Sequence, residues 1–504
     1  MLPIVFSVTQ KYDATNDVLY RFVSDGVETF LEYNHSRHGD IRHPVPAFMT
    51  QYSGVRLGWE VKVYLESGGR WSDRLLMELF YYGVTYGLDH DPDPEGRKDR
   101  PHKGLEGARN WLNESVSVCE WEGIVCGEIE PPNPGKMEFI LGPDWRDQIT
   151  SKVGYKPPPD AITQIDLPDR LCEGTLASEI ALLEHIHRIN LHHNYLRGTI
   201  PTEFGRFSSL THLDLGDNEL TGTIPSTLSQ LEYLEGLWLE QNKLEGAIHY
   251  GLSELRWCLI LDLSQNRLSG TIPPELERMS SLIGLYLEHN MLTGTVLHQI
   301  GNIRHLMVLE LGHNRLTGTI PTELGQLPLQ WLHLSHNQLN GTLPVQVLRT
   351  NLNSLQLASN QLSGTIPAGH DGSSKNKNKN NGFAWSALSQ LTYIVLEDNQ
   401  FQGTLAPSFL KGIGKSIVRY DTHTKYTRGV VVFFSFSSLT FFVCGMRSSL
   451  QLGYNRLRGT IPTEIGRLTR LSELTLSNNE LGGTLPKELG MLPNLQSLNL
   501  TANK

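Results

Sequence analysis

The sequence predicts a solenoid in which about 13 short, similar repeats stack side by side and share one long parallel β-sheet. Three observations predict this fold. The pattern L-x-x-L-x-L-x-x-N-x-L-x-G-T-I-P recurs from about residue 162, its Asn residues are mostly 24 residues apart, and each copy contains a Leu-x-Leu alternation. Such alternation places two apolar side chains on one face of a short strand. Because one strand cannot bury that face alone, the copies must stack.

The Asn of each copy follows directly after the strand. We expect its amide to point inward and to satisfy backbone groups at the turn, since buried backbone groups without a partner cost free energy. The G-T-I-P element supplies a turn and a second extended segment, and the L-G-x-L element supplies a short helical turn on the outer side. The expected structural Asn ladder is Asn194, Asn218, Asn242, Asn266, Asn290, Asn314, Asn337, Asn360, Asn399, Asn455 and Asn479.

This pattern resembles that of the plant-type extracellular leucine-rich repeat proteins, a family of receptor-like proteins, receptor kinases and cell-wall enzyme inhibitors. The resemblance covers residues 162–504, about two thirds of the chain, and the L-x-G-T-I-P element is typical of this subclass. It implies a leucine-rich-repeat solenoid of the α/β class, coiled as a right-handed, curved superhelix. The parallel β-sheet would line the concave face, and short 3-10 or helical turns and extended segments would form the convex face.

Residues 61–130 are expected to form an N-terminal cap, because the open end of a solenoid exposes apolar edges. The segment from Trp111 to Cys126 matches the cap pattern W…C-x-W-x-G-x-x-C of the same family, and this resemblance implies a disulfide between Cys119 and Cys126. Residues 73–82 place their apolar side chains on one face, which predicts a helix in the cap.

The other segments are less regular. Residues 1–60 have no pattern that we can interpret, and the Pro-rich residues 131–161 are expected to form a loop. Two insertions interrupt the repeats: a polar one at 369–382 and one at 418–447. The second contains the uncharged residues 429–446, which are long enough to span a membrane. A span there would divide one solenoid between two compartments, so we favour a loop or a retained intron, and a membrane segment stays the alternative.

The signals for localisation conflict. The first eight residues are too short for the apolar core of a signal peptide, and no basic segment precedes them. The cap and the glycosylation sequons at Asn113 and Asn340 favour a secretory route. We therefore expect an extracellular or cell-surface protein, with a cytoplasmic protein as the alternative. Membrane association is not clearly encoded.

Composition and motifs argue against several classes of protein. The formal net charge of −10 leaves no basic surface for nucleic acid. Protein-kinase signatures, the G-x-S-x-G nucleophile elbow and the H-E-x-x-H zinc motif are absent from the sequence. We therefore expect no enzyme, no cofactor and no metal. Cys172 and Cys258 occupy Leu positions of the repeat and are expected to be buried apolar fillers.

The solvent-facing positions of the strands are the candidate binding surface. The residue between the two strand leucines alternates between acids and aromatics, and flanking columns add Glu240, Glu288 and several His. Exposed Trp and Tyr are frequent anchors in binding sites, and acids around them favour a cationic or hydroxyl-rich partner. The predicted concave-face ligand-binding residues are Asp214, Trp238, Asp262, Tyr286, Glu310, Trp331 and His333.

Three functions remain open at this point. The first is a receptor-like recognition module in cell-surface signalling or defence, which binds a protein, peptide or glycan ligand on the concave face and signals with a co-receptor. The second is an inhibitor of an extracellular, cell-wall enzyme, which an acidic face would suit if the enzyme is basic. The third is an intracellular scaffold for protein interactions. The residues themselves do not identify the ligand.

Overall fold

The computed structural model describes residues 9–12, 17–24, 27–34, 117–127, 157–367, 391, 393–410, 413, 431–432, 441–442 and 448–504. The chain divides into two compact units, Met1–Ser209 and Leu210–Lys504. Several expected features lie outside the described residues. They are the cap helix at 73–82, the sequon at Asn113, most of the Pro-rich loop 131–161, the polar insertion 369–382 and most of the insertion 418–447.

The first unit begins with a small antiparallel sheet that the sequence analysis left uninterpreted. Its strands are β1 (Thr9–Tyr12), β2 (Asp17–Ser24) and β3 (Val27–Asn34), and β2 pairs with both neighbours. The register of β2 and β3 joins Ser24 to Val27 and Asp17 to Asn34. Both segments alternate apolar and polar residues and are separated by Asp-Gly, which is a hairpin signal in the sequence.

The first unit also contains the end of the cap and the first repeats. The short 3-10 helix η3 (Val118–Glu120) leads to β4 (Ile124–Cys126), which pairs antiparallel with β5 (Ile162–Asp166). Strand β5 then pairs parallel with β7 (Arg188–Asn190). A disulfide joins Cys119 and Cys126, whose Cα atoms are 5.5 Å apart. The unit is completed by β6 (Glu173–Thr175), η5 (Ser178–Leu182), β8 (Tyr195–Arg197) and η6 (Thr202–Arg206).

In the second unit, one strand per repeat forms a parallel sheet. In spatial order the strands are β9 (His212–Asp214), β10 (Gly236–Trp238), β12 (Ile260–Asp262), β14 (Gly284–Tyr286), β15 (Val308–Glu310), β17 (Trp331–His333), β19 (Ser354–Gln356), β21 (Tyr393–Val395), β25 (Ser448–Gln451), β27 (Leu471–Thr475) and β29 (Ser497–Asn499). The register keeps equivalent residues opposite one another: Leu237 faces Leu213 on one side and Leu261 on the other. All three are fully buried. The predicted solenoid is thus confirmed.

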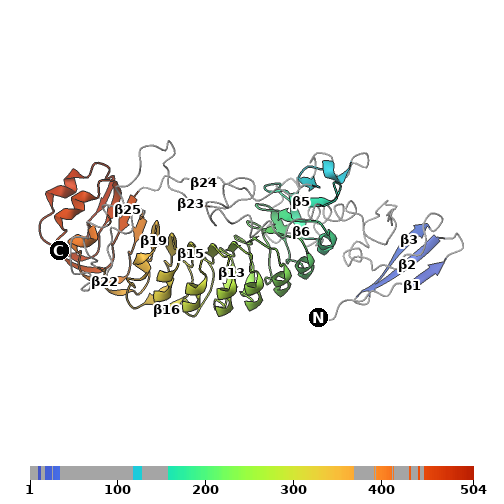
Figure 1. The fold of residues 1–504 in the computed structure, drawn as a ribbon, viewed down its shortest axis with the longest axis horizontal. Coiled ribbons are helices and arrows are strands. Elements are labelled where there is room, and N and C mark those ends of the chain that lie inside the picture. The colour runs from blue at the N-terminus through green and yellow to red at the C-terminus, as the bar shows by residue number, and fades with distance from the viewer. Residues whose placement is uncertain are drawn as a thin grey trace. The chain divides into compact units, whose positions relative to one another are not determined.

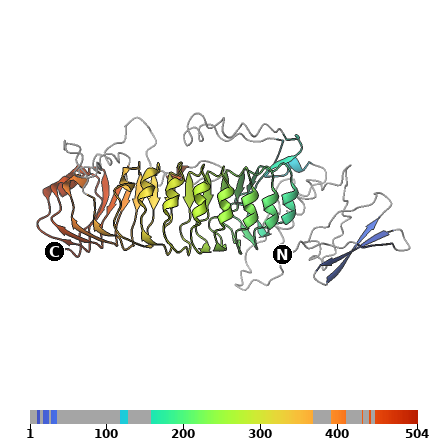
Figure 2. The same cartoon turned by 60° about the horizontal axis from the view of Figure 1, so that its bottom comes forward.

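Eight described repeats of this unit have a 3-10 turn on their outer side. Within the second unit these turns lie on the outer, convex side and the parallel sheet lies on the inner, concave side (Figure 1). Figure 2 shows the turns from the front. They are η7 (Ser226–Gln230), η8 (Tyr250–Glu254), η9 (Pro274–Arg278), η10 (His298–Asn302), η11 (Thr322–Gln326), η12 (Val347–Arg349), η14 (Thr463–Arg467) and η15 (Lys487–Met491). Several of these turns directly follow the Pro of G-T-I-P. Pro321, for example, is the N-cap of η11 and has a φ of −66°. The ring already restricts φ to this value.

Besides the long parallel sheet, each of several repeats contributes a second short strand, and these strands pair in smaller parallel sheets. They are β11 (Glu245–Ala247) with β13 (Arg267–Ser269), β16 (Thr317–Thr319) with β18 (Gln338–Asn340), and β20 (Ser363–Thr365), β22 (Gln400–Thr404), β26 (Arg456–Gly459) and β28 (Glu480–Leu481) in that order. Gly318 has a φ of +77°, and a Cβ there would lie 2.9 Å from Thr295 Cγ2. The Gly of the repeat is therefore required both by backbone conformation and by the close approach of a Thr from the preceding repeat.

The Asn ladder joins neighbouring repeats. The side-chain amide of Asn290 donates to the carbonyl oxygens of Leu263, Leu287 and Glu288 at 3.0, 3.2 and 3.3 Å. Its oxygen accepts from the backbone N–H of Leu268 at 2.9 Å. The same arrangement recurs at Asn266, Asn314 and further positions. Each Asn thus satisfies backbone groups of its own repeat and of the preceding one.

The insertion 418–447 leaves the sheet continuous. Strand β21, before the insertion, pairs directly with β25 after it, and Ile394 lies opposite Leu450. Within the insertion, β23 (Val431–Val432) pairs antiparallel with β24 (Phe441–Phe442). Among the residues that the structure describes, no helix has the length and apolar character needed to cross a membrane.

We predict that Asn290→Ala lowers the free energy of unfolding by about 3 kcal/mol, because two or more buried backbone groups lose their partner at ~1–3 kcal/mol each. Urea denaturation followed by circular dichroism measures this change. Gln361→Ala, at an exposed position, is the control and should leave the midpoint unchanged. Equal midpoints for the two variants would contradict the structural role of the ladder.

Candidate ligand-binding face

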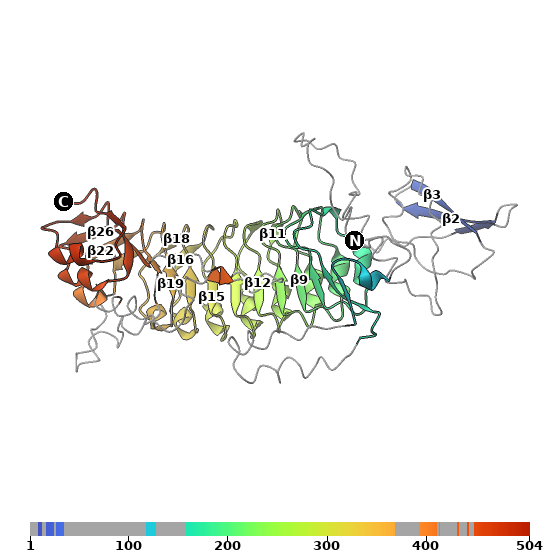
Figure 3. The same cartoon turned by 90° about the horizontal axis from the view of Figure 1, so that it is seen from above.

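The sheet of the second unit brings the predicted residues into one row. Trp238 lies opposite Asp214 and Asp262, and Tyr286 lies opposite Asp262 and Glu310. Adjacent strands are about 4.8 Å apart, so the acids and the aromatics alternate at that spacing. Figure 3 looks onto these strands from above.

The row continues to His333, which lies opposite Glu310. Trp331 is not in the row: it begins β17 and faces Val308 on one side and Ser354 on the other. Asn340 ends β18 and is exposed. Cys172 and Cys258, which occupy Leu positions, are buried as free thiols.

Two glycines determine how the aromatic rings lie. A Cβ at Gly236 would come within 2.0 Å of ring atoms of Trp238, and a Cβ at Gly284 would lie 2.7 Å from Tyr286 Cε2. Each ring therefore covers the glycine two residues before it on the same strand. Trp238 is only 8% exposed and Asp214 only 1%, so the expectation that these two positions face solvent is wrong. The imidazole of His212 stacks against Trp238, with ring centroids 6.1 Å apart and planes 8° apart. The sequence analysis missed these glycines, although the Gly-Leu-aromatic pattern in two strands was a visible signal.

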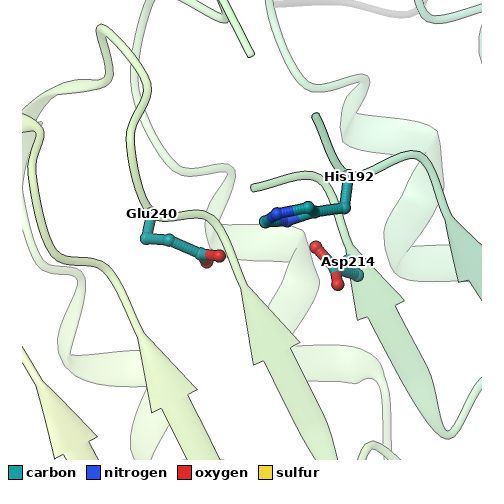
Figure 4. A group of neighbouring side chains, drawn as sticks. All are labelled: His192, Asp214 and Glu240. Carbon is teal, nitrogen blue, oxygen red and sulfur yellow. The ribbon is translucent and has the colours of Figure 1, made fainter. Parts of the chain in front are cut away.

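Glu240 and Glu288 extend the acidic character beyond the central row. The carboxylates of Asp214 and Glu240 lie close together near the ends of two neighbouring strands (Figure 4). An oxygen of one lies within 4.8 Å of an oxygen of the other. A Cβ at Gly216 would meet the Glu240 carboxylate, so this glycine leaves room for it. The backbone N–H of Gly216 donates to Asp214 Oδ1 at 3.1 Å.

The acids of this face raise one another's pKa. Burial, followed by the charges of Glu310 and Asp214, raises the pKa of Asp262 to about 7 although Ser264 donates two hydrogen bonds to it. Burial, followed by Glu310 and Asp262, raises the pKa of Glu288 to about 9.

Glu240 and Tyr286 belong to the same electrostatic system. The pKa of Glu240 lies well above its ordinary value, first through burial and then through Asp262 and Asp214. Burial and the charge of Glu310 likewise raise the pKa of the Tyr286 hydroxyl. Because each further negative charge is disfavoured here, the face should attract a cationic group.

One edge of the face carries a stack of histidines. The imidazoles of His289, His313 and His336 lie parallel, with successive ring centroids 3.9 and 4.0 Å apart. Burial, followed by its two neighbours, lowers the pKa of His313 to about 4. The central ring therefore stays neutral where an ordinary His would begin to take up a proton.

Comparison with known families identifies the repeats. The profile described as Leucine rich repeat matches residues 184–244, and a second Leucine Rich Repeat profile matches residues 259–279, 305–327, 328–348 and 470–492. The chain is a leucine-rich repeat protein.

Similar proteins narrow this class to the plant type. Receptor-like protein 3 of Arabidopsis thaliana is 30% identical over 95 residues, which are 19% of this chain and 9% of that protein. The crystal structure of a TDR receptor superposes with a TM-score of 0.53 at 25% identity, covering 68% of this chain and 56% of that one. The plant peptide hormone receptor RGFR1 in complex with RGF2 superposes with a TM-score of 0.47 at 28% identity, covering 69% and 56%. The chain thus spans about half the length of these structures and resembles plant receptor-like proteins.

We predict that thermal stability falls between pH 5 and pH 9 and that Glu288→Gln reduces this fall. The pKa of Glu288 is raised in the folded state, so its contribution is fully present below its ordinary pKa of 4.5 and is lost as pH rises through about 9. A difference of one bound proton between the folded and unfolded states changes the free energy of unfolding by at most about 1.4 kcal/mol per pH unit. Differential scanning calorimetry at several pH values measures the slope.

The matched control for this experiment is Glu232→Gln, which neutralises an exposed acid of the same unit. At pH 9 the Glu288→Gln variant should melt at a higher temperature than the wild type, whereas Glu232→Gln should not. A wild-type slope retained in full by Glu288→Gln would contradict the raised pKa.

Proposed function

We propose that this chain is the ligand-recognition part of a receptor-like protein and binds a cationic region of a protein or peptide on its concave face. The observation that carries the proposal is the row from Asp214 to Glu310, in which two glycine-seated aromatic rings alternate with acids and the pKa of the central acid, Asp262, is raised. A planar guanidinium or an ammonium group can stack on Trp238 and pair with the neighbouring carboxylates. Binding such a group relieves the repulsion among the acids.

The likeness to receptor-like protein 3 and to the TDR receptor supports a receptor-like role. The Cys119–Cys126 disulfide supports an oxidising compartment, and hence an extracellular or cell-surface location. The recognition role requires binding and no chemical turnover. A glycan ligand, a co-receptor and glycosylation at Asn340 stay predictions.

Inhibition of an extracellular enzyme is the second candidate. The specific observation in its favour is the acidic face, which would complement the surface of a basic enzyme. Assays against cell-wall hydrolases distinguish the two functions, because an inhibitor lowers hydrolysis at stoichiometric concentration and a receptor does not.

We predict that Trp238→Ala combined with Tyr286→Ala weakens binding of a fluorescein-labelled oligoarginine peptide by about tenfold or more, which is ~1.4 kcal/mol. The loss of both stacking surfaces is the reason. Fluorescence anisotropy at low salt measures the affinity, and a negatively charged oligoglutamate peptide is the control ligand.

Tyr250→Ala is the matched control, because Tyr250 is an exposed aromatic residue on the outer turn η8 and does not belong to the strands that carry the row. It should bind oligoarginine like the wild type. If the double variant keeps wild-type affinity, or if oligoglutamate binds equally well, the proposed face is wrong.

A further inference from the structure

Three side chains from three successive repeats form a hydrogen-bonded chain on the concave face. His333 Nδ1 lies 3.0 Å from Glu310 Oε1, and His333 Nε2 lies 2.9 Å from Ser354 Oγ. Glu310, His333 and Ser354 belong to the adjacent strands β15, β17 and β19. A carboxylate thus contacts one nitrogen of an imidazole whose other nitrogen contacts a hydroxyl.

The partners assign the direction of each hydrogen bond. Because Nδ1 faces a carboxylate, which only accepts, we assign the proton of the neutral His333 to Nδ1, and Nε2 is then the acceptor. The Ser354 hydroxyl donates to Nε2. The Gln356 side-chain amide lies 3.4 Å from Ser354 Oγ and 3.1 Å from His333 Nε2, so it can donate to the serine oxygen.

This order of groups is the one that activates a serine nucleophile. An imidazole within hydrogen-bond distance of a hydroxyl can take its proton, and a carboxylate on the far nitrogen stabilises the imidazolium that forms. Such constellations are recognised by geometry and not by sequence position. The absence of a linear motif in the sequence therefore does not bear on this one.

The strand neighbours of Ser354 are aromatic. Trp331 and Tyr393 lie opposite Ser354 on the two neighbouring strands. Ser354 itself is only 2% exposed. An apolar group that approaches along the face would meet these rings, and the low exposure limits competition by bulk water.

We propose that Ser354 is an activated nucleophile that accepts an acyl group from an aromatic or apolar ester. Ser354 Oγ attacks the ester carbonyl carbon while its proton passes to His333 Nε2, and Glu310 holds the resulting imidazolium. The amide of Gln356, 3.4 Å from Ser354 Oγ, would donate a hydrogen bond to the developing negative oxygen. The alcohol leaves with the proton from His333, which yields acyl-Ser354. Water then releases the acid with His333 as base and restores the serine.

The chain contains a matched serine without the imidazole. Ser449 on β25 occupies the strand position equivalent to that of Ser354, lies opposite Tyr393 and is also 2% exposed. Its hydroxyl donates to Glu473 Oε2 at 3.2 Å, directly to a carboxylate. Burial and strand position are therefore shared, but the hydroxyl of Ser449 meets a carboxylate where that of Ser354 meets an imidazole.

The test treats the full chain with 4-nitrophenyl acetate and follows nitrophenolate release and acetylation of individual serines by peptide mass spectrometry. We expect acetyl-Ser354 and unmodified Ser449. Ser354→Ala should abolish the adduct and the burst of nitrophenolate, and His333→Gln should slow acetylation at least tenfold. Ser449→Ala should react like the wild type.

Acetylation of Ser449 to the same extent as Ser354, or an unchanged rate in His333→Gln, would overturn the proposal, as would the lack of any acetyl-Ser354. Circular dichroism melts establish that each variant is folded.

Discussion

Each repeat can add its strand only if the backbone at the end of that strand keeps its hydrogen-bond partners. A buried Asn meets this need by bonding to carbonyl groups of two consecutive repeats and to a backbone N–H of the preceding one. An apolar residue of similar size would leave those groups unpaired away from water. The leucine register, the second sheets and the outer turns all depend on this repeated connection, because it sets the step from one repeat to the next.

This constraint separates the side chains that hold the fold from those that vary. The leucines and the Asn point inward, so the residue between the leucines is free for function on a rigid sheet. The same rigidity keeps the acids of the concave face close together when no partner is bound. As a result, the pKa values of Asp262 and Glu288 lie above those of ordinary exposed acids. Charge and stacking together are therefore the basis of the proposed cationic ligand.

Much of the fold and part of the site could be predicted from the repeat alone. The period located the strands, and the column from Asp214 to Glu310 followed by counting. Counting did not reveal that Gly236 and Gly284 seat the aromatic rings, because this depends on ring orientation. It also placed Trp331 among the binding residues without showing that it neighbours Ser354. The hairpin β2–β3 was missed although the alternation in both segments was visible.

By itself, the sequence determined the repeat, the inward Asn ladder and the column of residues between the strand leucines, because each follows from a period that any stacked strand must obey. Only the tertiary structure decided which groups interact across strands. The pKa values of Asp262 and Glu288 depend on burial and on distances to acids one or two repeats away. The chain from Glu310 through His333 to Ser354 requires three residues that lie more than 20 positions apart in sequence to meet within hydrogen-bond distance. Such contacts are set by the packing of neighbouring strands, which no single repeat encodes.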